Sequence, residues 1–203
     1  MQSSLTNTES CGELLFAAMT FAKVRLVRYT VAMNLSRSIR LIILLLVLGG
    51  TVGCDQTTKH IARKKLNQFD TVMVLGGLGE LQLAENSGAF LSLGDSLPQA
   101  IRTLVFTFAA GIGLLAMFVY LLLRPRWHWL AFFGIAFVMA GGASNLIDRI
   151  TRNGLVTDFL TLRCGPLHTG VFNVADVFVM LGIVLFVLSA WIGSRQSIAS
   201  RQN

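Results

Sequence analysis

Four apolar segments dominate this sequence and limit what it can fold into. They cover residues 41–54, 103–123, 127–144 and 177–193. A helix needs about 20 apolar residues to cross the hydrocarbon core of a bilayer, and the first segment reaches that length if residues 36–40 join it with their arginines snorkelling. Because lipid offers the backbone no hydrogen-bond partners, each segment should be helical. At 54% hydrophobic and 13% charged residues, the chain has more apolar surface than a soluble core would bury.

The sequence therefore predicts an all-α integral membrane protein with four transmembrane helices. Residues 1–35 would form a cytoplasmic or interfacial extension, 36–193 the membrane domain and 194–203 a cytoplasmic tail. After a polar helical stretch, apolar and polar residues alternate within 71–83, which indicates a small extracytoplasmic sheet and loop region between helices 1 and 2. Residues 14–21 are too short to span, so either they form an interfacial helix or translation starts at Met33 instead of Met1.

The basic residues flank the apolar segments. Although the net charge is +7, this distribution is typical of a topology signal and not of a nucleic-acid-binding surface. Three groups of basic residues fall on one side of the membrane if the chain crosses it four times. One group precedes the first span, one consists of Arg124 and Arg126, and one follows the fourth span. Both termini are therefore expected in the cytoplasm. Residues 55–97 and 145–171 would then lie outside the cytoplasm. Basic residues within 59–65 argue against this topology, but acidic residues of the same loop offset their charge.

Two aspartates border the outer membrane surface. Asp158 lies in an apolar stretch where desolvation would raise its pKa, as for a general acid, although it could instead cap a turn. Asp176 follows Asn173, a good helix N-cap, so helix capping is the alternative for Asp176. Both acids border the same loop and could converge to share one proton and activate water. The helix start favours Asp176 as the ionised base and leaves Asp158 as the protonated acid.

Other polar residues suggest weaker hypotheses. Asp148 is expected to form a structural clasp with the adjacent Arg149 and neighbouring loops. The histidines form no HExxH zinc motif, and a serine site using Ser87 or Ser144 with His168 lacks the G-x-S-x-G pattern.

The three cysteines form no CxxC pair and indicate no metal. Whether Cys54 and Cys164 form a disulfide is left open by their spacing. Residues 41–54 also resemble a lipoprotein signal segment ending at Cys54, but the three further spans disfavour cleavage there.

Five short motifs appear in order along the chain. They are Asp-Gln-Thr-Thr-Lys at 55–59, Asn-Ser-Gly-Ala-Phe at 86–90, Asn-Leu-Ile-Asp-Arg at 145–149, Val-Thr-Asp-Phe at 156–159 and Phe-Asn-Val-Ala-Asp at 172–176. Through them, residues 33–193 resemble the lipoprotein signal peptidases, a bacterial family of membrane aspartic peptidases. The chain departs from the family in having one alanine fewer in the second motif, Ser144 where glycine is more usual, and a longer N-terminal extension.

The resemblance implies a catalytic dyad of Asp158 and Asp176 with no metal or other cofactor. It also implies a set of residues that shape or support the substrate site: Asp55, Lys59, Asn86, Gly88, Asn145, Asp148, Arg149, Asn173 and Ala175. The expected substrates are diacylglyceryl-modified prolipoproteins, cut N-terminal to the lipidated cysteine. The protein is expected in the bacterial inner membrane, in contact with membrane lipid. We expect a monomer whose active site lies near the periplasmic face.

Two other functions are consistent with four basic, apolar spans. A small proton-coupled transporter would place an acid near the middle of the bilayer, whereas the acids here gather at the ends of the spans. A non-enzymatic membrane scaffold would tolerate replacement of Asp158 and Asp176.

Overall fold

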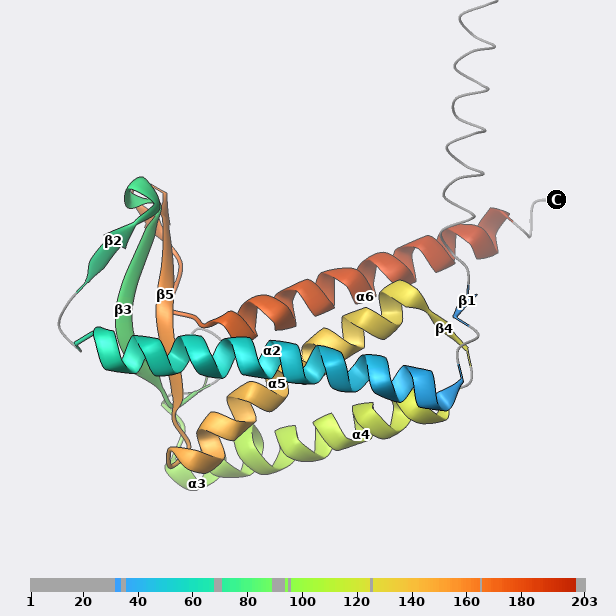
Figure 1. Ribbon diagram of the computed structural model, residues 1–203, viewed down its shortest axis with the longest axis horizontal. Helices are drawn as coiled ribbons and strands as arrows, with labels where there is room; N and C mark the ends of the chain where they lie inside the picture. The colour runs from blue at the N-terminus through green and yellow to red at the C-terminus, as the bar shows by residue number, and fades with distance from the viewer. Residues whose placement is uncertain are drawn as a thin grey trace, which may run out of the picture.

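Four long helices form the body of the protein (Figure 1). The computed structural model describes residues 32–33, 36–67, 71–88, 94, 96–124, 126–164 and 166–199. The helices are α2 (Arg37–Lys65), α3 (Gln99–Arg102) continuing through a π-helical segment (Thr103–Ala109) into α4 (Ala110–Leu123), α5 (Trp129–Thr151) and α6 (Val174–Ala199). Four stretches are long and apolar enough to cross a membrane, namely Arg37–Lys65, Gln99–Leu123, Trp129–Thr151 and Val174–Ser194. The prediction of four spanning helices is confirmed at this level.

The helices extend beyond the apolar segments that predicted them. Helix α2 has 29 residues, which at about 1.5 Å per residue exceeds the ~30 Å thickness of the hydrocarbon core. Its last turns carry the polar helical stretch expected after Cys54. Helix α5 runs on to Thr151, so the motif at 145–149 lies on a helix and not in the outer loop. Cys54 lies within the unbroken helix α2 and is free and exposed, so it does not pair with Cys164.

A small antiparallel sheet stands at one end of the helices (Figure 1). Among the described residues it has the strand order β2-β3-β5-β6, with β2 at Val72–Val74, β3 at Gly79–Asn86, β5 at Val156–Cys164 and β6 at Leu167–His168. The sheet was expected in the connection between the first two spans, but half of its strands come from the connection between α5 and α6. Strand β5 is buried on both faces over Val156, Thr157, Asp158 and Phe159, where apolar and polar residues do not alternate.

Strand pairing places Asp158 beside β3, near one end of the ladder between the two strands. Ala84 of β3 pairs with Asp158, and Asn86 pairs with Val156 two residues earlier in β5. A register shift between Leu81 and Ala84 bends β3 on the approach to this site. The connection between the first two spans and the connection between α5 and α6 therefore build the surroundings of Asp158 together.

Helices α5 and α6 pack at a distance that only glycine permits. A Cβ atom at Gly182 would lie 2.5 Å from the Gly134 carbonyl oxygen, and one at Gly134 would lie 2.8 Å from that of Gly182. A Cβ at Gly141 would collide with the Ala175 carbonyl oxygen. Small residues let membrane helices approach closely, and here they bring the polar end of α5 against the first turn of α6.

The opposite end of the helices is held by an apolar cluster and one buried arginine. The cluster includes Leu44, Leu121, Trp127 and Phe132. Arg40 was expected to snorkel, but it is buried and its guanidinium donates to the carbonyl oxygens of Leu121, Leu122 and Arg124. It thus satisfies carbonyl groups left free at the end of α4. At this end β1 (Ala32–Met33) pairs with β4 (Trp127–His128). The rest of the extension and residues 200–203, including the candidate interfacial helix at 14–21, lie outside the described residues.

Candidate active site

Asp158 is buried on β5 and accepts two hydrogen bonds. Only 2% of the residue's surface is exposed. Asn173 Nδ2 donates to Asp158 Oδ1 at 2.6 Å, and Asn86 Nδ2 donates to Asp158 Oδ2 at 2.8 Å. Burial raises the pKa of Asp158 to about 6; the hydrogen bonds from Asn86 and Asn173 oppose this rise, and the charge of Asp176 adds to it. Desolvation therefore dominates, as expected for an acid in an apolar stretch.

Asp176 lies in the first turn of α6, in a reciprocal cap with Asn173. The Asp176 amide donates to Asn173 Oδ1 at 3.0 Å, and the Asn173 amide donates to Asp176 Oδ2 at 3.1 Å. This is the capping-box geometry with Asn and Asp in place of the usual Ser and Glu. Helix capping, the simpler interpretation of Asp176, is therefore real. It leaves the other carboxylate oxygen to accept from Asn145 Nδ2 at 3.0 Å.

Asn173 and Asn145 link the two aspartates. The Asn173 side-chain amide donates both to Asp158 Oδ1 and, at 3.2 Å, to Asn145 Oδ1. Its main-chain amide donates to Asp176. One residue thus contacts both carboxyl groups, and their charges are close enough to interact. The two acids converge as predicted from their position on either side of one loop.

Behind the aspartates, Lys59 occupies the centre of a buried charge cluster. Its Nζ lies 2.7 Å from Asp55 Oδ2 and 3.1 Å from Asp148 Oδ2, with all three side chains at most 2% exposed. It also donates to Asn145 Oδ1 at 2.8 Å. The backbone amide of Ala175 donates to Asp55 Oδ1 at 2.8 Å, which anchors α6 to α2. One ammonium group therefore balances two buried carboxylates and also contacts Asn145, a ligand of Asp176.

The segment after β3 completes the site. Gly88 donates its amide to Asn86 Oδ1 at 2.9 Å, which orients the amide that serves Asp158. The Gly88 carbonyl oxygen accepts from Arg149 Nη2 at 2.6 Å. The Arg149 guanidinium lies within electrostatic reach of both Asp158 and Asp176. Asp148 was expected to form a clasp with Arg149 and neighbouring loops. It does accept from the Thr157 amide of a neighbouring segment and interacts with the charge of Arg149, but its ion-pair partner is Lys59.

All of the residues predicted for the site enter this one network. Three further residues belong to it that the sequence did not identify: Gln56, Ser144 and Thr157. Gln56 Nε2 donates to Ser144 Oγ and Asp148 Oδ1, and Ser144 Oγ donates to Asp55 Oδ2 at 2.7 Å. The signal was available, because Ser144 and Asp148 are four residues apart and share one face of α5.

The alternative serine site does not form. Ser144 is fully buried and bonded to Asp55, whereas His168 is on β6 and its ring contacts the carbonyl oxygen of neighbouring Thr169. Ser87 accepts a hydrogen bond from Arg102. The hydroxyls considered as nucleophiles therefore serve other contacts.

Comparison with known proteins gives one consistent answer. Residues 51–192, which contain the whole site, match the Peptidase A8 family, described as signal peptidase (SPase) II. The lipoprotein signal peptidase of Desulforapulum autotrophicum is 34% identical over 137 residues, covering 67% of this chain and 83% of that protein. The lipoprotein signal peptidase of Parasynechococcus marenigrum is 36% identical over 148 residues, covering 73% of this chain and 88% of that protein.

A solved structure of a bacterial membrane enzyme shares the fold, with a TM-score of 0.65 and 23% identity over 73% of this chain and 87% of the other. With its four candidate spans, the chain is a multi-pass membrane protein and a protease, which excludes the transporter and scaffold alternatives as its primary function. From the match across its membrane domain and its kinship to named relatives, we conclude that this chain belongs to the signal peptidase II family of bacterial membrane peptidases.

Proposed function

We propose that this peptidase cuts diacylglyceryl-modified prolipoproteins N-terminal to the lipidated cysteine, using water activated by Asp158 and Asp176. The observation that carries the proposal is the pair of buried carboxyl groups held by Asn173, which donates to Asp158 at 2.6 Å and to Asp176 at 3.1 Å. Two carboxyl groups this closely associated bind one proton between them. Such a pair provides a base and an acid in one place.

In the proposed mechanism, the ionised Asp176 takes a proton from water while the water oxygen attacks the scissile carbonyl carbon. The neutral Asp158 donates its proton to the carbonyl oxygen, giving a tetrahedral intermediate. When the C–N bond breaks, Asp176 passes its proton to the departing amine of the cysteine, and Asp158 recovers a proton from the hydroxyl. The carboxyl groups supply every proton transfer, so the mechanism needs no metal or cofactor.

The polar network supports the assignment of these roles. Asp176 accepts hydrogen bonds on both oxygens and lies at a helix N-terminus, which stabilises a negative charge. Asp158 is the acid whose pKa is raised to about 6 by burial. Because one chain supplies all of these groups, we propose that the monomer is the active unit.

We place this site at the periplasmic face. The starts of α2 and α5 and the end of α4 lie at one end of the helices, away from the sheet and from the start of α6 (Figure 1). Asp158 belongs to strand β5 of this sheet and Asp176 to the first turn of α6. Arg37, Arg40 and Arg124 flank the spans at that end, which favours a cytoplasmic location for it. A site at the outer surface would meet the end of a signal helix while the acyl chains of the substrate stay in lipid.

Cleavage of a defined precursor tests the function. Purified full-length protein in lipid nanodiscs is expected to release the signal peptide from a diacylglyceryl-modified precursor and leave a product that begins at the lipidated cysteine. The same precursor with an unmodified cysteine is expected to react at least about tenfold more slowly, because it lacks binding energy from the acyl chains. Mass spectrometry of both products is the measurement.

A chelator should leave the rate unchanged. Equal cleavage of the two precursors would remove lipid recognition from the proposal, and a folded protein that cuts neither would remove the activity.

The pH dependence of cleavage tests the role of Asp158. Above its pKa the pair loses the proton that the carbonyl oxygen must receive, so kcat/KM should fall along an alkaline limb governed by the raised pKa of about 6. Asn86→Ala removes a donor that favours the charged form of Asp158. The alkaline limb of this variant should therefore lie at higher pH than that of the wild type. The expected difference is about one pH unit, the value of a hydrogen bond to a charged group.

The matched control is Gln82→Ala, on the same strand, whose side chain donates to Thr161 and not to Asp158. A pH-rate profile of the three proteins is the measurement. A limb that stays in place in Asn86→Ala, or that moves equally in the control, would contradict the role given to Asp158.

A further inference from the structure

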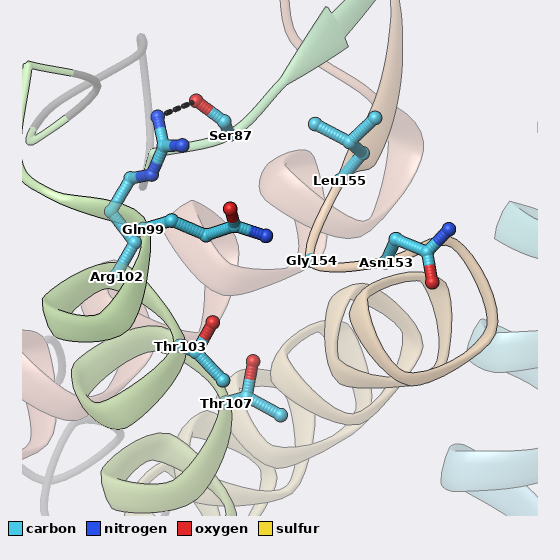
Figure 2. A pocket seen from close by; sticks show the side chains of 8 residues that line it. All are labelled: Ser87, Gln99, Arg102, Thr103, Thr107, Asn153, Gly154 and Leu155. Carbon is cyan, nitrogen blue, oxygen red and sulfur yellow. Dashed lines mark hydrogen bonds between the residues drawn. The ribbon is translucent and has the colours of Figure 1, made fainter.

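Arg102 lies near the start of the second span, which begins at Gln99. It is the last residue of α3, directly before the π-helical segment Thr103–Ala109. Such segments are rare within helices and occur frequently at functional sites. Arg102 Nη1 donates to Ser87 Oγ at 2.6 Å, as Figure 2 shows. The contact joins the second span to the segment that follows β3.

Ser87 stands between two residues that contact the active site. On one side, Asn86 donates to Asp158 Oδ2 at 2.8 Å. On the other, the Gly88 carbonyl oxygen accepts from Arg149, and the Gly88 amide orients the Asn86 side chain. Any displacement of Ser87 moves both neighbours, because they share its peptide bonds.

A small polar cavity lies beside this contact. It has a volume of about 30 Å³ and is lined by residues that include Gln99, Arg102, Thr103 and Asn153 (Figure 2). This is room for about one or two water molecules. Without the arginine, water could reach the Ser87 hydroxyl and compete for its hydrogen bond, so the segment would lose a fixed attachment to the second span.

We propose that Arg102 is a positioning residue for the reaction: by holding Ser87, it fixes the Asn86 amide against Asp158 and so sets the proton affinity of that acid. This inference rests on the proposed function only for its effect on cleavage. Its effect on Asp158 itself follows from the chain of contacts Arg102, Ser87, Asn86, Asp158. Loss of Arg102 should act as a weaker form of losing Asn86.

A double-mutant cycle tests the contact. Arg102→Gln and Ser87→Ala should each move the alkaline limb of the pH-rate profile upward by about half a unit, in the same direction as Asn86→Ala. The double variant should move it no further than either single change, because each removes the same hydrogen bond between Arg102 and Ser87. Arg102→Lys should recover part of the shift, since an ammonium group can also donate to Ser87. Thr107→Val, on the wall of the same cavity, should leave the limb in place.

A second measurement does not depend on cleavage. The carboxyl group of Asp158 can be titrated by ¹³C NMR of aspartate-labelled protein, its signal assigned by its absence in Asp158→Asn. Arg102→Gln should raise the titration midpoint. If Arg102→Gln does not fold, Ser87→Ala, which removes a single oxygen atom, decides the question.

The two proposals fail separately. A midpoint that does not move in the folded variants, or additive effects in the cycle, would overturn the role of Arg102 even if the wild type cleaves. A wild type that does not cleave the lipidated precursor, but whose midpoint responds to Arg102, would refute the proposed function and leave this inference standing.

Discussion

Replacement of Asp158 or Asp176 by asparagine is expected to lower the rate of precursor cleavage by at least about 10³-fold, since general acid and base catalysis contribute about 10² to 10⁴ each. Asparagine keeps the shape of the side chain and one acceptor oxygen, so each variant keeps one of the two hydrogen bonds that the aspartate accepts and loses the other. It cannot exchange a proton with water or with a carbonyl oxygen. Because the two acids act as a unit, the double variant should be little slower than either single one.

Loss of activity must be separated from loss of fold. Asp158→Asn removes a buried ionisable group but places an amide donor against Asn86 or Asn173, so it should cost about 1 to 3 kcal/mol and still fold. Asp176→Asn weakens the cap of α6 and should cost about 1 kcal/mol. Glu85→Gln is the matched control, because Glu85 is an exposed acid of the neighbouring strand that lies beside Thr157, on the other face of the sheet from Asp158, and pairs with Arg152; its rate should stay within about twofold of wild type. A folded aspartate variant that retains a tenth of the wild-type rate would refute the dyad.

Lys59→Met is expected to have the largest effect on stability. The ammonium group of Lys59 lies 2.7 Å from Asp55 and 3.1 Å from Asp148, both buried. Methionine fills much of the same volume but leaves two carboxylates without a cation. Removing one partner of a buried ion pair costs about 3 to 5 kcal/mol. The change should also release Asn145, a ligand of Asp176, so that any folded fraction should cleave slowly.

Thermal unfolding in detergent measures this effect against Lys64→Met, an exposed lysine near the end of the same helix. The control should unfold within a degree or two of wild type. Adding Asp55→Asn to Lys59→Met should restore part of the stability, because it removes one of the two unpaired charges. If Lys59→Met unfolds at the wild-type temperature, the cluster does not hold the helices together.

The spans and the two converging acids could be predicted because both depend on local signals. Hydropathy marks a spanning helix without reference to its neighbours, and Asp158 and Asp176 border one loop. Strand β5 was missed because its first four residues are buried on both faces, and the remaining alternation of residues 160–163 is too short to mark a strand. The ion-pair partner of Asp148 was also missed. Arg149 is its neighbour in sequence, but the ammonium group that pairs with it belongs to Lys59 on α2, which precedes it by 89 residues. Sequence adjacency indicates which residues share a turn of helix, but not which helices pack together.

The bond between the Ala175 amide and Asp55 joins residues 120 positions apart. Synthesis proceeds from the N-terminus, so Asp55 is made and inserted long before its partner in the last helix exists. Asp158 likewise lacks its hydrogen-bond donor Asn173 until that residue has been synthesised. In the proposed mechanism the catalytic pair is complete only after the fourth span has been made and inserted. A truncated chain that ends before this span is therefore expected to lack proteolytic activity.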